Sequence, residues 1–257
     1  MVSLAKKKIY RGEIYQMERY NLIVVRWGTL YNAEHVINLY EGAKRYTSVP
    51  FKFYVFTDNT KDLPQDLGWQ FIKLPEYDVP HDRGWWYKME IFNQQHCLTG
   101  KNLYVDLDTI IIKDLKAFWD LIIADGLYIC RDFNRQFLPT YQACNSSVMG
   151  WKDSAFDYVF RKFMLKPSVN MGKYRGDQDY IQAHVTSKIF WPDELAMSWK
   201  WECWRRGKIG SENYKSDKPQ TFIKQETRIL VFHGIPKPED CQDERMISIW
   251  RGTVKHK

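Results

Sequence analysis

Runs of β-branched and aromatic residues alternate with segments of helical periodicity through the first half of the chain, and this alternation limits the fold most strongly. Strands are expected at 21–27, 51–58, 69–74 and 103–112, and helices at 33–46 and 85–98. Strands separated by helices favour parallel pairing, because a parallel connection has to cross over the sheet. The sequence therefore predicts an α/β fold in which a mostly parallel, twisted sheet is flanked by helices.

The second half of the chain is less regular. Strands are expected at 126–133 and 143–151 and a helix at 154–165, but beyond residue 185 the periodicity weakens into a Trp-rich region. No linker and no internal repeat divides the 257 residues. A chain of this length can bury one large core, so we expect a single domain over 1–257.

The charge of the chain narrows the class of ligand. The 38 Lys and Arg residues outnumber the 31 Asp and Glu residues, and the net charge of +7 suits a phosphate-bearing ligand, an anionic membrane surface or nucleic acid. The basic clusters at 6–8 and 205–206 are short, and no zinc-finger or RNP pattern accompanies them. Nucleic acid is therefore not expected as a partner.

Cysteine content and hydropathy indicate the compartment. The five cysteines are widely spaced without a CxxC pair, which suggests neither a disulfide framework nor a zinc knuckle. No stretch approaches the roughly 18 consecutive apolar residues that a membrane-spanning helix needs. We expect a soluble, cytoplasmic protein whose basic surface is compatible with peripheral membrane contact.

The stretch "LYVDLDTIII" at 103–112 contains two acids that the folding of a strand does not require. Side chains alternate along a strand, so Asp106 and Asp108 would point to the same face. A buried carboxylate without a partner is too costly to keep ionised, so the pair needs a wet strand end, basic partners or a cation. Carboxylate oxygens favour Mg²⁺ or Mn²⁺, which often bridge to substrate phosphates. Two solvated acids at a strand end are the simpler alternative.

In its context this stretch resembles the DxD signature of GT-A fold glycosyltransferases, most closely the glycogenin and bacterial galactosyltransferase type. Five further motifs stand in the family's order over about 20–240. The motifs before the two acids are "IVVRWGTLY" and "FKFYVFTDN", and those after them are "NSSV", "GDQDYI" and "FHGIPKP". The last motif departs from the family's pattern, because His233 and Gly234 are adjacent and Glu239 follows Pro238. The resemblance implies a nucleotide-sugar-binding half at about 20–125, an acceptor and sugar half at 126–240, and a C-terminal tail at 241–257.

The resemblance also implies the residues of the site. Asp177 and Gln178 would lie beside the sugar as catalytic residues, and the metal ligands would be Asp106, Asp108 and His233. Arg83 and Lys88, near an expected helix start, are further candidates for contact with the donor. The residues expected to bind the nucleotide sugar are Val25, Arg26, Trp27, Tyr31, Thr57, Asp58, Arg83, Lys88, Asp106, Leu107, Asn145, Ser146, Gly234 and Lys237.

The resemblance and these residues together predict a metal-dependent glycosyltransferase. A hexose would pass from a nucleotide-diphosphate sugar, with UDP favoured as the nucleotide, to a glycan, lipid-linked or protein acceptor. The resemblance implies Mn²⁺ or Mg²⁺ as cofactor and retention of configuration. A divalent cation and Lys237 would stabilise the charge that develops on the diphosphate leaving group.

Two other functions remain open at this point. An aspartyl-phosphate phosphohydrolase would use Asp106 as nucleophile and Asp108 as acid and base. In that class the nucleophile follows the first strand, whereas here strand-helix-strand precedes Asp106. A catalytically inactive sugar-binding module, with its aromatic surface as the binding face, is the other alternative.

Overall fold

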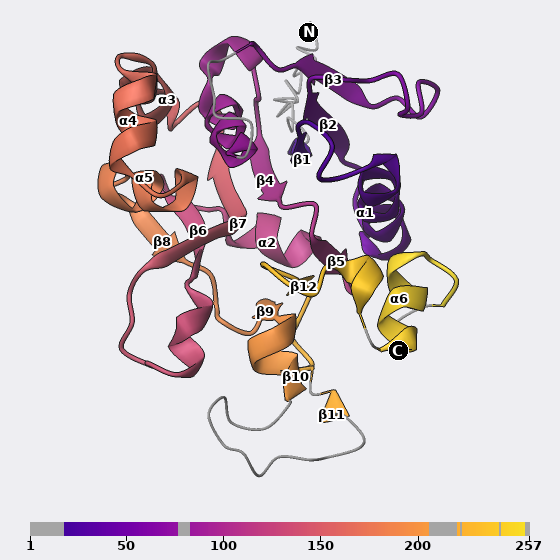
Figure 1. Ribbon diagram of the computed structural model, residues 1–257. Helices are drawn as coiled ribbons and strands as arrows, with labels where there is room; N and C mark the ends of the chain where they lie inside the picture. Colours follow the sequence, from indigo (N-terminus) through magenta and orange to yellow (C-terminus); the bar gives the residue numbers. More distant parts are fainter. Residues whose placement is uncertain (1–17, 77–82, 206–219, 222, 242, 255–257) are drawn as a thin grey trace, which may run out of the picture.

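A seven-stranded sheet forms the centre of the molecule in the computed structural model, which describes residues 18–76, 83–205, 220–221, 223–241 and 243–254 (Figure 1). The strand order is β3-β2-β1-β4-β7-β6-β8. The strands are β1 (Tyr20–Arg26), β2 (Lys52–Thr57), β3 (Gln70–Lys73), β4 (Lys101–Val105), β6 (Leu127–Arg131), β7 (Cys144–Lys152) and β8 (Lys188–Phe190).

Most of the strand pairs are parallel, which confirms the predicted fold class. Strand β1 is parallel to β2 and β4, β2 to β3, and β6 to β8, whereas β7 is antiparallel to both β4 and β6. Strand β7 comes from the second half of the sequence and lies beside β4 from the first half. Both halves therefore contribute to the same sheet.

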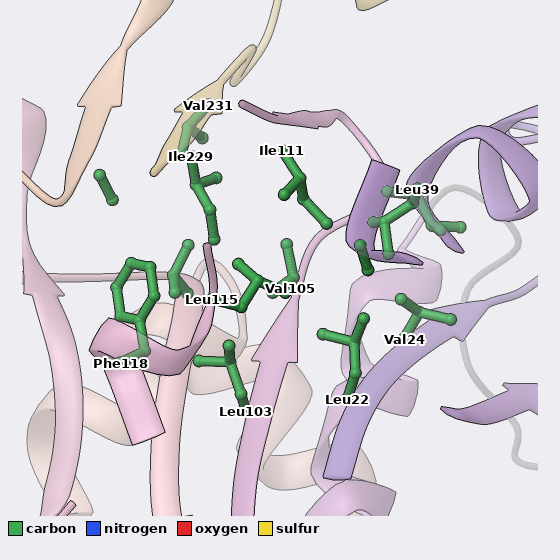
Figure 2. Close-up of a cluster of buried hydrophobic side chains, with 14 of the residues drawn as sticks. Leu22, Val24, Leu39, Leu103, Val105, Ile111, Leu115, Phe118, Ile229 and Val231 are labelled. Atoms are coloured by element: carbon green, nitrogen blue, oxygen red, sulfur yellow. The ribbon is translucent and has the colours of Figure 1, made fainter. Parts of the chain in front are cut away.

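Helices cover both faces of this sheet because the strands are apolar on both sides. Leu22 and Val24 of β1 belong to one buried cluster, with helices α1 (Ala33–Tyr46) and α2 (Lys116–Leu121). Ile23 belongs to a second one, with α3 (Asp157–Met164), α5 (Asp177–His184) and the 3₁₀ helix η1 (Gly84–Phe92). Figure 2 shows the first cluster, in which Leu39 of α1 and Phe118 of α2 pack over the sheet. This arrangement is the pattern expected for parallel strands buried on both faces.

The helical elements are mostly short. The α-helices are α1 (Ala33–Tyr46), α2 (Lys116–Leu121), α3 (Asp157–Met164), α4 (Pro167–Lys173), α5 (Asp177–His184) and α6 (Glu244–Trp250). The 3₁₀ helices are η1 (Gly84–Phe92), η2 (Gln94–His96), η3 (Phe133–Gln136) and η5 (Pro238–Asp240), and η4 (Trp199–Cys203) is a π-helix. Among the described residues, none of these helices has the length and apolar character needed to span a bilayer.

The prediction of one strand over 103–112 is wrong. Strand β4 ends at Val105, and the chain continues into β5 (Thr109–Ile111), which belongs to a different sheet with β12 (Ile229–Val231) and β9 (Ala196–Ser198). The hydroxyl of Thr109 donates to the carbonyl oxygen of Asp106 at 2.8 Å and closes the turn between the two strands. Both acids therefore lie at a junction between sheets, where the alternation of a single strand does not apply.

The prediction of an α-helix over 85–98 is also wrong. The segment forms two 3₁₀ helices, η1 and η2, separated at Asn93, whose backbone is extended and whose side chain accepts from Gln95 N. Residues 86–92 are all buried, so apolar spacing in this segment does not mark one face of an amphipathic helix. The remaining sheet is a short pair, β10 (Trp204–Arg205) with β11 (Gln220–Thr221).

Candidate functional site

The predicted site residues gather where the main strands end. The carboxyl ends of the parallel strands β1, β2 and β4 share one edge, and the antiparallel β7 begins there, since Asp106 N donates to Ser147 O at 2.8 Å. A cavity of about 670 Å³ opens at this edge. Its walls include Val25, Trp27, Tyr31, Lys88, Asp106, Leu107, Asp108, Asn145, Ser146, Asp177, Gln178, His233 and Lys237 from the predicted set.

Asp106 belongs to a buried network centred on Lys88. The ammonium of Lys88 lies 3.0 Å from Asp106 Oδ1 and 3.0 Å from Asp177 Oδ2. Burial alone would lower the pKa of Lys88, but the charges of Asp106 and Asp177 outweigh it and raise that pKa above its ordinary value. Ser146 Oγ donates to Asp177 at 2.7 Å, and the Tyr104 hydroxyl donates to Asp106 at 2.5 Å. The network holds both carboxylates in place and keeps Lys88 charged.

Asp108 has a different set of partners. Lys237 Nζ lies 2.6 Å from Asp108 Oδ2 and donates to the Tyr31 hydroxyl at 2.9 Å, while that hydroxyl donates to the same carboxylate oxygen at 3.1 Å. Burial and the charge of Asp106 raise the pKa of Asp108, and Lys237 opposes this shift. Burial also raises the pKa of Tyr31, so its hydroxyl keeps its proton. Lys237 is therefore the main counter-charge of Asp108.

His233 is a neutral residue in this cavity wall. Its Nε2 lies 2.7 Å from Ser198 Oγ, and its ring stacks on Phe133 at a centroid distance of 5.1 Å. Burial lowers the pKa of His233 to about 3, with further lowering by Lys200 and Lys237. A neutral imidazole is the form that binds metal ions, but Nε2 already has a partner in Ser198.

The predicted three-ligand metal set is not assembled in advance. Among the described residues, no three His, Cys, Asp or Glu side chains are grouped closely enough to hold a metal ion. Asp106, Asp108 and His233 nevertheless line the same cavity. The donor set fits a cation held by the two carboxylates together with substrate phosphate oxygens, which is how Mg²⁺ is commonly bound. The metal site stays a prediction on that basis.

The N-terminal end of α5 places the two predicted catalytic residues. Asp177 is the first residue of the helix, and Gln178 follows it into the cavity wall. Gln178 Nε2 donates to Asp132 Oδ2 at 3.2 Å, and its Oε1 accepts from Ser146 N at 3.4 Å. These bonds fix the amide of Gln178 against β7, at the start of which Asn145 Oδ1 accepts from Ser147 N at 3.0 Å.

Five of the predicted donor residues lie outside the cavity lining, namely Arg26, Thr57, Asp58, Arg83 and Gly234. The guanidinium of Arg26 pairs with both carboxylate oxygens of Asp62, at 2.7 and 2.6 Å. Thr57 donates to Asn59 O, Asp58 accepts from Gly28 N, and Arg83 donates to Met171 O. These contacts position loops around the cavity, and contact of these five residues with the donor stays a prediction.

Other residues of the wall were not among the predicted ones. Trp85 is 43% exposed and lines the cavity, whereas its neighbour Trp86 is fully buried against Phe163. Tyr104 and Ser147 also line it; Tyr104 lies two residues before Asp106, and Ser147 belongs to "NSSV" itself. Their position next to motif residues was the signal that would have identified them.

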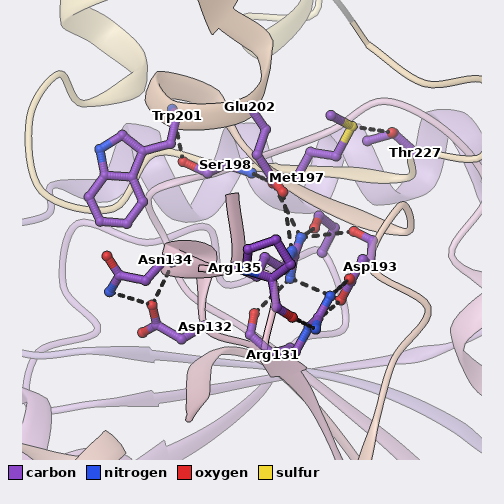
Figure 3. Close-up of polar contacts among 12 residues, drawn as sticks. Arg131, Asp132, Asn134, Arg135, Asp193, Met197, Ser198, Trp201, Glu202 and Thr227 are labelled. Carbon is purple, nitrogen blue, oxygen red and sulfur yellow. Dashed lines mark hydrogen bonds and ion pairs between the residues drawn. The ribbon is translucent and has the colours of Figure 1, made fainter. Parts of the chain in front are cut away.

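A polar network holds Ser198, the partner of His233 (Figure 3). Arg135 of η3 donates through Nε to Glu202 of η4 at 3.1 Å, and Glu202 accepts from Ser198 N at 2.7 Å. Burial raises the pKa of Glu202, and the charge of Arg135 opposes that shift. Asp193 adds an ion pair with Arg131 to the same network. The partner of His233, Ser198, is thus held by an ion pair between distant parts of the chain.

Solved structures share this architecture. The galactosyltransferase LgtC, solved in complex with donor and acceptor sugar analogues, aligns with a TM-score of 0.62 at 12% sequence identity, over 91% of this chain and 96% of that chain. The fold is GT-A-like. The glycosyltransferase GlyE of Streptococcus pneumoniae aligns with a TM-score of 0.60 at 15% identity, over 91% of this chain and 61% of that chain.

At these identities the likeness shows the GT-A-like fold and nothing finer. No protein-family model matches the chain, and no curated protein matches it. The chemistry of the site therefore has to be argued from the cavity and its side chains.

Proposed function

We propose that this protein is a metal-dependent glycosyltransferase that transfers a hexose from a nucleotide-diphosphate sugar to an acceptor hydroxyl. The proposed donor is a UDP-sugar. The observation that carries the proposal is the convergence of Asp106, Asp108, Lys88 and Lys237 on one cavity at the strand ends of a GT-A-like fold. In α/β sheets, ligands bind at this edge. The acceptor would be a glycan, a lipid-linked glycan or a protein.

The diphosphate would lie against the Asp108 side of the cavity. Lys237 is only partly buried, with 22% of its side chain exposed, and its present partners are Asp108 and Tyr31. We propose that it exchanges Asp108 for a phosphate oxygen of the donor, because an ammonium binds phosphate well as a point charge. When bound, a divalent cation at Asp106 and Asp108 would neutralise the charge that develops on the leaving diphosphate.

The sugar would lie near Asp177 and Gln178. Gln178 is held between Asp132 and Ser146 N, so its amide has a fixed orientation in the wall. Asp177 is held by Lys88 and Ser146 and remains a hydrogen-bond acceptor for sugar hydroxyls. The proposed stereochemical outcome is retention, as the resemblance to the retaining type implies.

Donor hydrolysis tests this proposal. Purified protein with Mn²⁺ is expected to release the nucleoside diphosphate from at least one sugar in a panel of nucleotide sugars. The variants Asp106→Ala, Asp108→Ala and His233→Ala should lose this turnover while their circular dichroism spectra stay like that of the wild type. Asp120→Ala, which changes an exposed acid on α2, is the matched control and should keep it.

Two results would refute the proposal. One is the absence of turnover with every nucleotide sugar, and the other is full activity in all three site variants. Sugar binding without turnover, surviving Asp108→Ala, would favour the inactive sugar-binding module. Trapping by beryllium fluoride at Asp106 would favour the aspartyl-phosphate phosphohydrolase.

A further inference from the structure

Lys200 is a cation beside the cavity that no motif predicted. It belongs to the π-helix η4, and its ammonium lies so close to Gly234 that a Cβ on that glycine would be 2.8 Å from Lys200 Nζ. Gly234 has a φ of +74°, which favours glycine, and it stands between His233 and Lys237 in the loop after β12. Because Gly234 has no Cβ, the Lys200 ammonium can lie against its backbone.

The acids around the cavity are already matched with other lysines. Lys88 pairs with Asp106 and Asp177, and Lys237 pairs with Asp108. Lys200 makes no ion pair and donates no hydrogen bond to any residue within the described part of the chain. Its ammonium instead lies over the ring of Trp201, 5.3 Å from the ring centroid. A half-buried ammonium without a carboxylate partner is a place where an anion would be stabilised.

The charge of Lys200 interacts with the charges of Lys237 and Asp108. Burial lowers the pKa of Lys200, Lys237 lowers it further, and Asp108 opposes the shift. Lys200 and Lys237 both lower the pKa of His233. Two lysines thus act on the same wall of the cavity, where one carboxylate, Asp108, is the nearby counter-charge.

We propose that Lys200, together with the backbone at Gly234, forms a second phosphate-binding position next to Lys237. This inference rests on the proposed function and extends it, because it adds a residue that binds the substrate. The phosphate could come from the donor's diphosphate or from a phosphate group on the acceptor. The shared chemistry is a phosphoryl oxygen accepting from the Lys200 ammonium.

Calorimetric titration without divalent metal tests the proposal. UDP, inorganic diphosphate and uridine are each titrated into the wild type and into the variants Lys200→Met and Lys200→Arg. The control variant is Lys152→Met, because Lys152 is an exposed lysine at the end of β7. Lys200→Met is expected to weaken UDP and diphosphate binding by about tenfold or more, a size typical of one charge-assisted hydrogen bond. Uridine binding should be unchanged, Lys200→Arg should stay close to the wild type, and Lys152→Met should match it.

A second set of titrations separates the two sources of phosphate. Inorganic phosphate is added to protein already saturated with UDP. Weaker UDP binding in Lys200→Met assigns the position to the donor, whereas weaker phosphate binding to the UDP complex assigns it to the acceptor. Equal binding of all these anions by Lys200→Met and the wild type overturns the proposal.

The two proposals fail in different ways. If the wild type binds UDP and hydrolyses a donor while Lys200→Met binds UDP, diphosphate and inorganic phosphate identically, the role of Lys200 is wrong and the glycosyltransferase stands. If the wild type turns over no donor but binds inorganic phosphate through Lys200, the phosphate position stands and the glycosyltransferase is wrong. If the wild type binds none of the anions, the phosphate position is refuted. Thermal unfolding of Lys200→Met should match the wild type, so that a lost fold is not mistaken for lost binding.

Discussion

The two acids of "DLD" lie two residues apart and have opposite surroundings. Asp106 shares one buried lysine, Lys88, with Asp177, so its side of the cavity holds two carboxylates for one ammonium. Asp108 faces Lys237, with Lys200 close by, so its side holds two ammonium groups for one carboxylate. The first side is fixed by the core. The second side is suited to exchange its partners when an anion binds.

The elements that carry the two lysines differ in the same way. Lys88 belongs to η1, in which residues 86–92 are all buried. Lys237 follows a loop in which Ile235 is 82% exposed. A buried, fully bonded side chain is difficult to move, whereas a side chain on an exposed loop can change partners at little cost. The comparison therefore predicts different consequences for the loss of each lysine.

Lys88→Met should have the largest effect. It leaves Asp106 and Asp177 without their shared counter-charge, and breaking a buried ion pair typically destabilises a protein by about 3–5 kcal/mol. Chemical denaturation measures the free energy of unfolding. Lys116→Met is a matched control, since Lys116 pairs with Asp120 at 2.6 Å on the surface, and solvent screening should leave stability nearly unchanged in that variant. If Lys88→Met and Lys116→Met lowered the free energy of unfolding equally, the claim that the core fixes the Asp106 side of the cavity would be contradicted.

Lys237→Met should destabilise less, by about 1–2 kcal/mol. Asp108 already has a raised pKa from burial, so it can take up a proton when its lysine is lost. An acid whose pKa is raised on folding destabilises the native state once it is ionised, so this loss should shrink as the pH falls from about 7. Denaturation at several pH values measures it. A loss as large as that of Lys88→Met, independent of pH, would show that the Asp108 side is equally fixed.

His233→Phe should change the pH dependence of stability more than stability itself. The pKa of His233 is lowered to about 3 from an ordinary 6.5. As the pH falls, this imidazole therefore becomes protonated in the unfolded chain at a higher pH than in the native protein. Stability is lost as the pH falls between these values, by about 1 kcal/mol per pH unit. The variant should lack this part of the slope when denaturation is measured with a chelator present. Parallel curves for the variant and the wild type would contradict burial of a neutral His233.

The sequence predicted the sheet from its apolar strands, and the resemblance to GT-A glycosyltransferases supplied most of the predicted residues that line the cavity. Strands β1, β2 and β4 are apolar on both faces, so they read clearly as buried strands, and the polar residues at their ends had to meet at one edge. Asp106, Asn145 and Asp177 come from three separate motifs and still line one cavity.

Features set by contacts between distant residues could not be predicted. The break of 103–112 into two strands depends on β12, which pairs with β5 from more than a hundred residues away in the sequence. Arg135 and Glu202 form an ion pair between η3 and η4 that no local spacing indicates. Lys200 lies in a Trp-rich segment without periodicity, and only the folded chain brings it to Gly234.

Calorimetric titration of UDP into the protein tests the central claim, that this cavity binds a nucleoside diphosphate through its two acids and a cation. In Mn²⁺, UDP is expected to bind, and replacing Mn²⁺ by a chelator or changing Asp108 to Asn should weaken that binding by about tenfold, or about 1.4 kcal/mol. No binding of UDP in Mn²⁺, or binding that neither the chelator nor Asp108→Asn changes, would contradict the account.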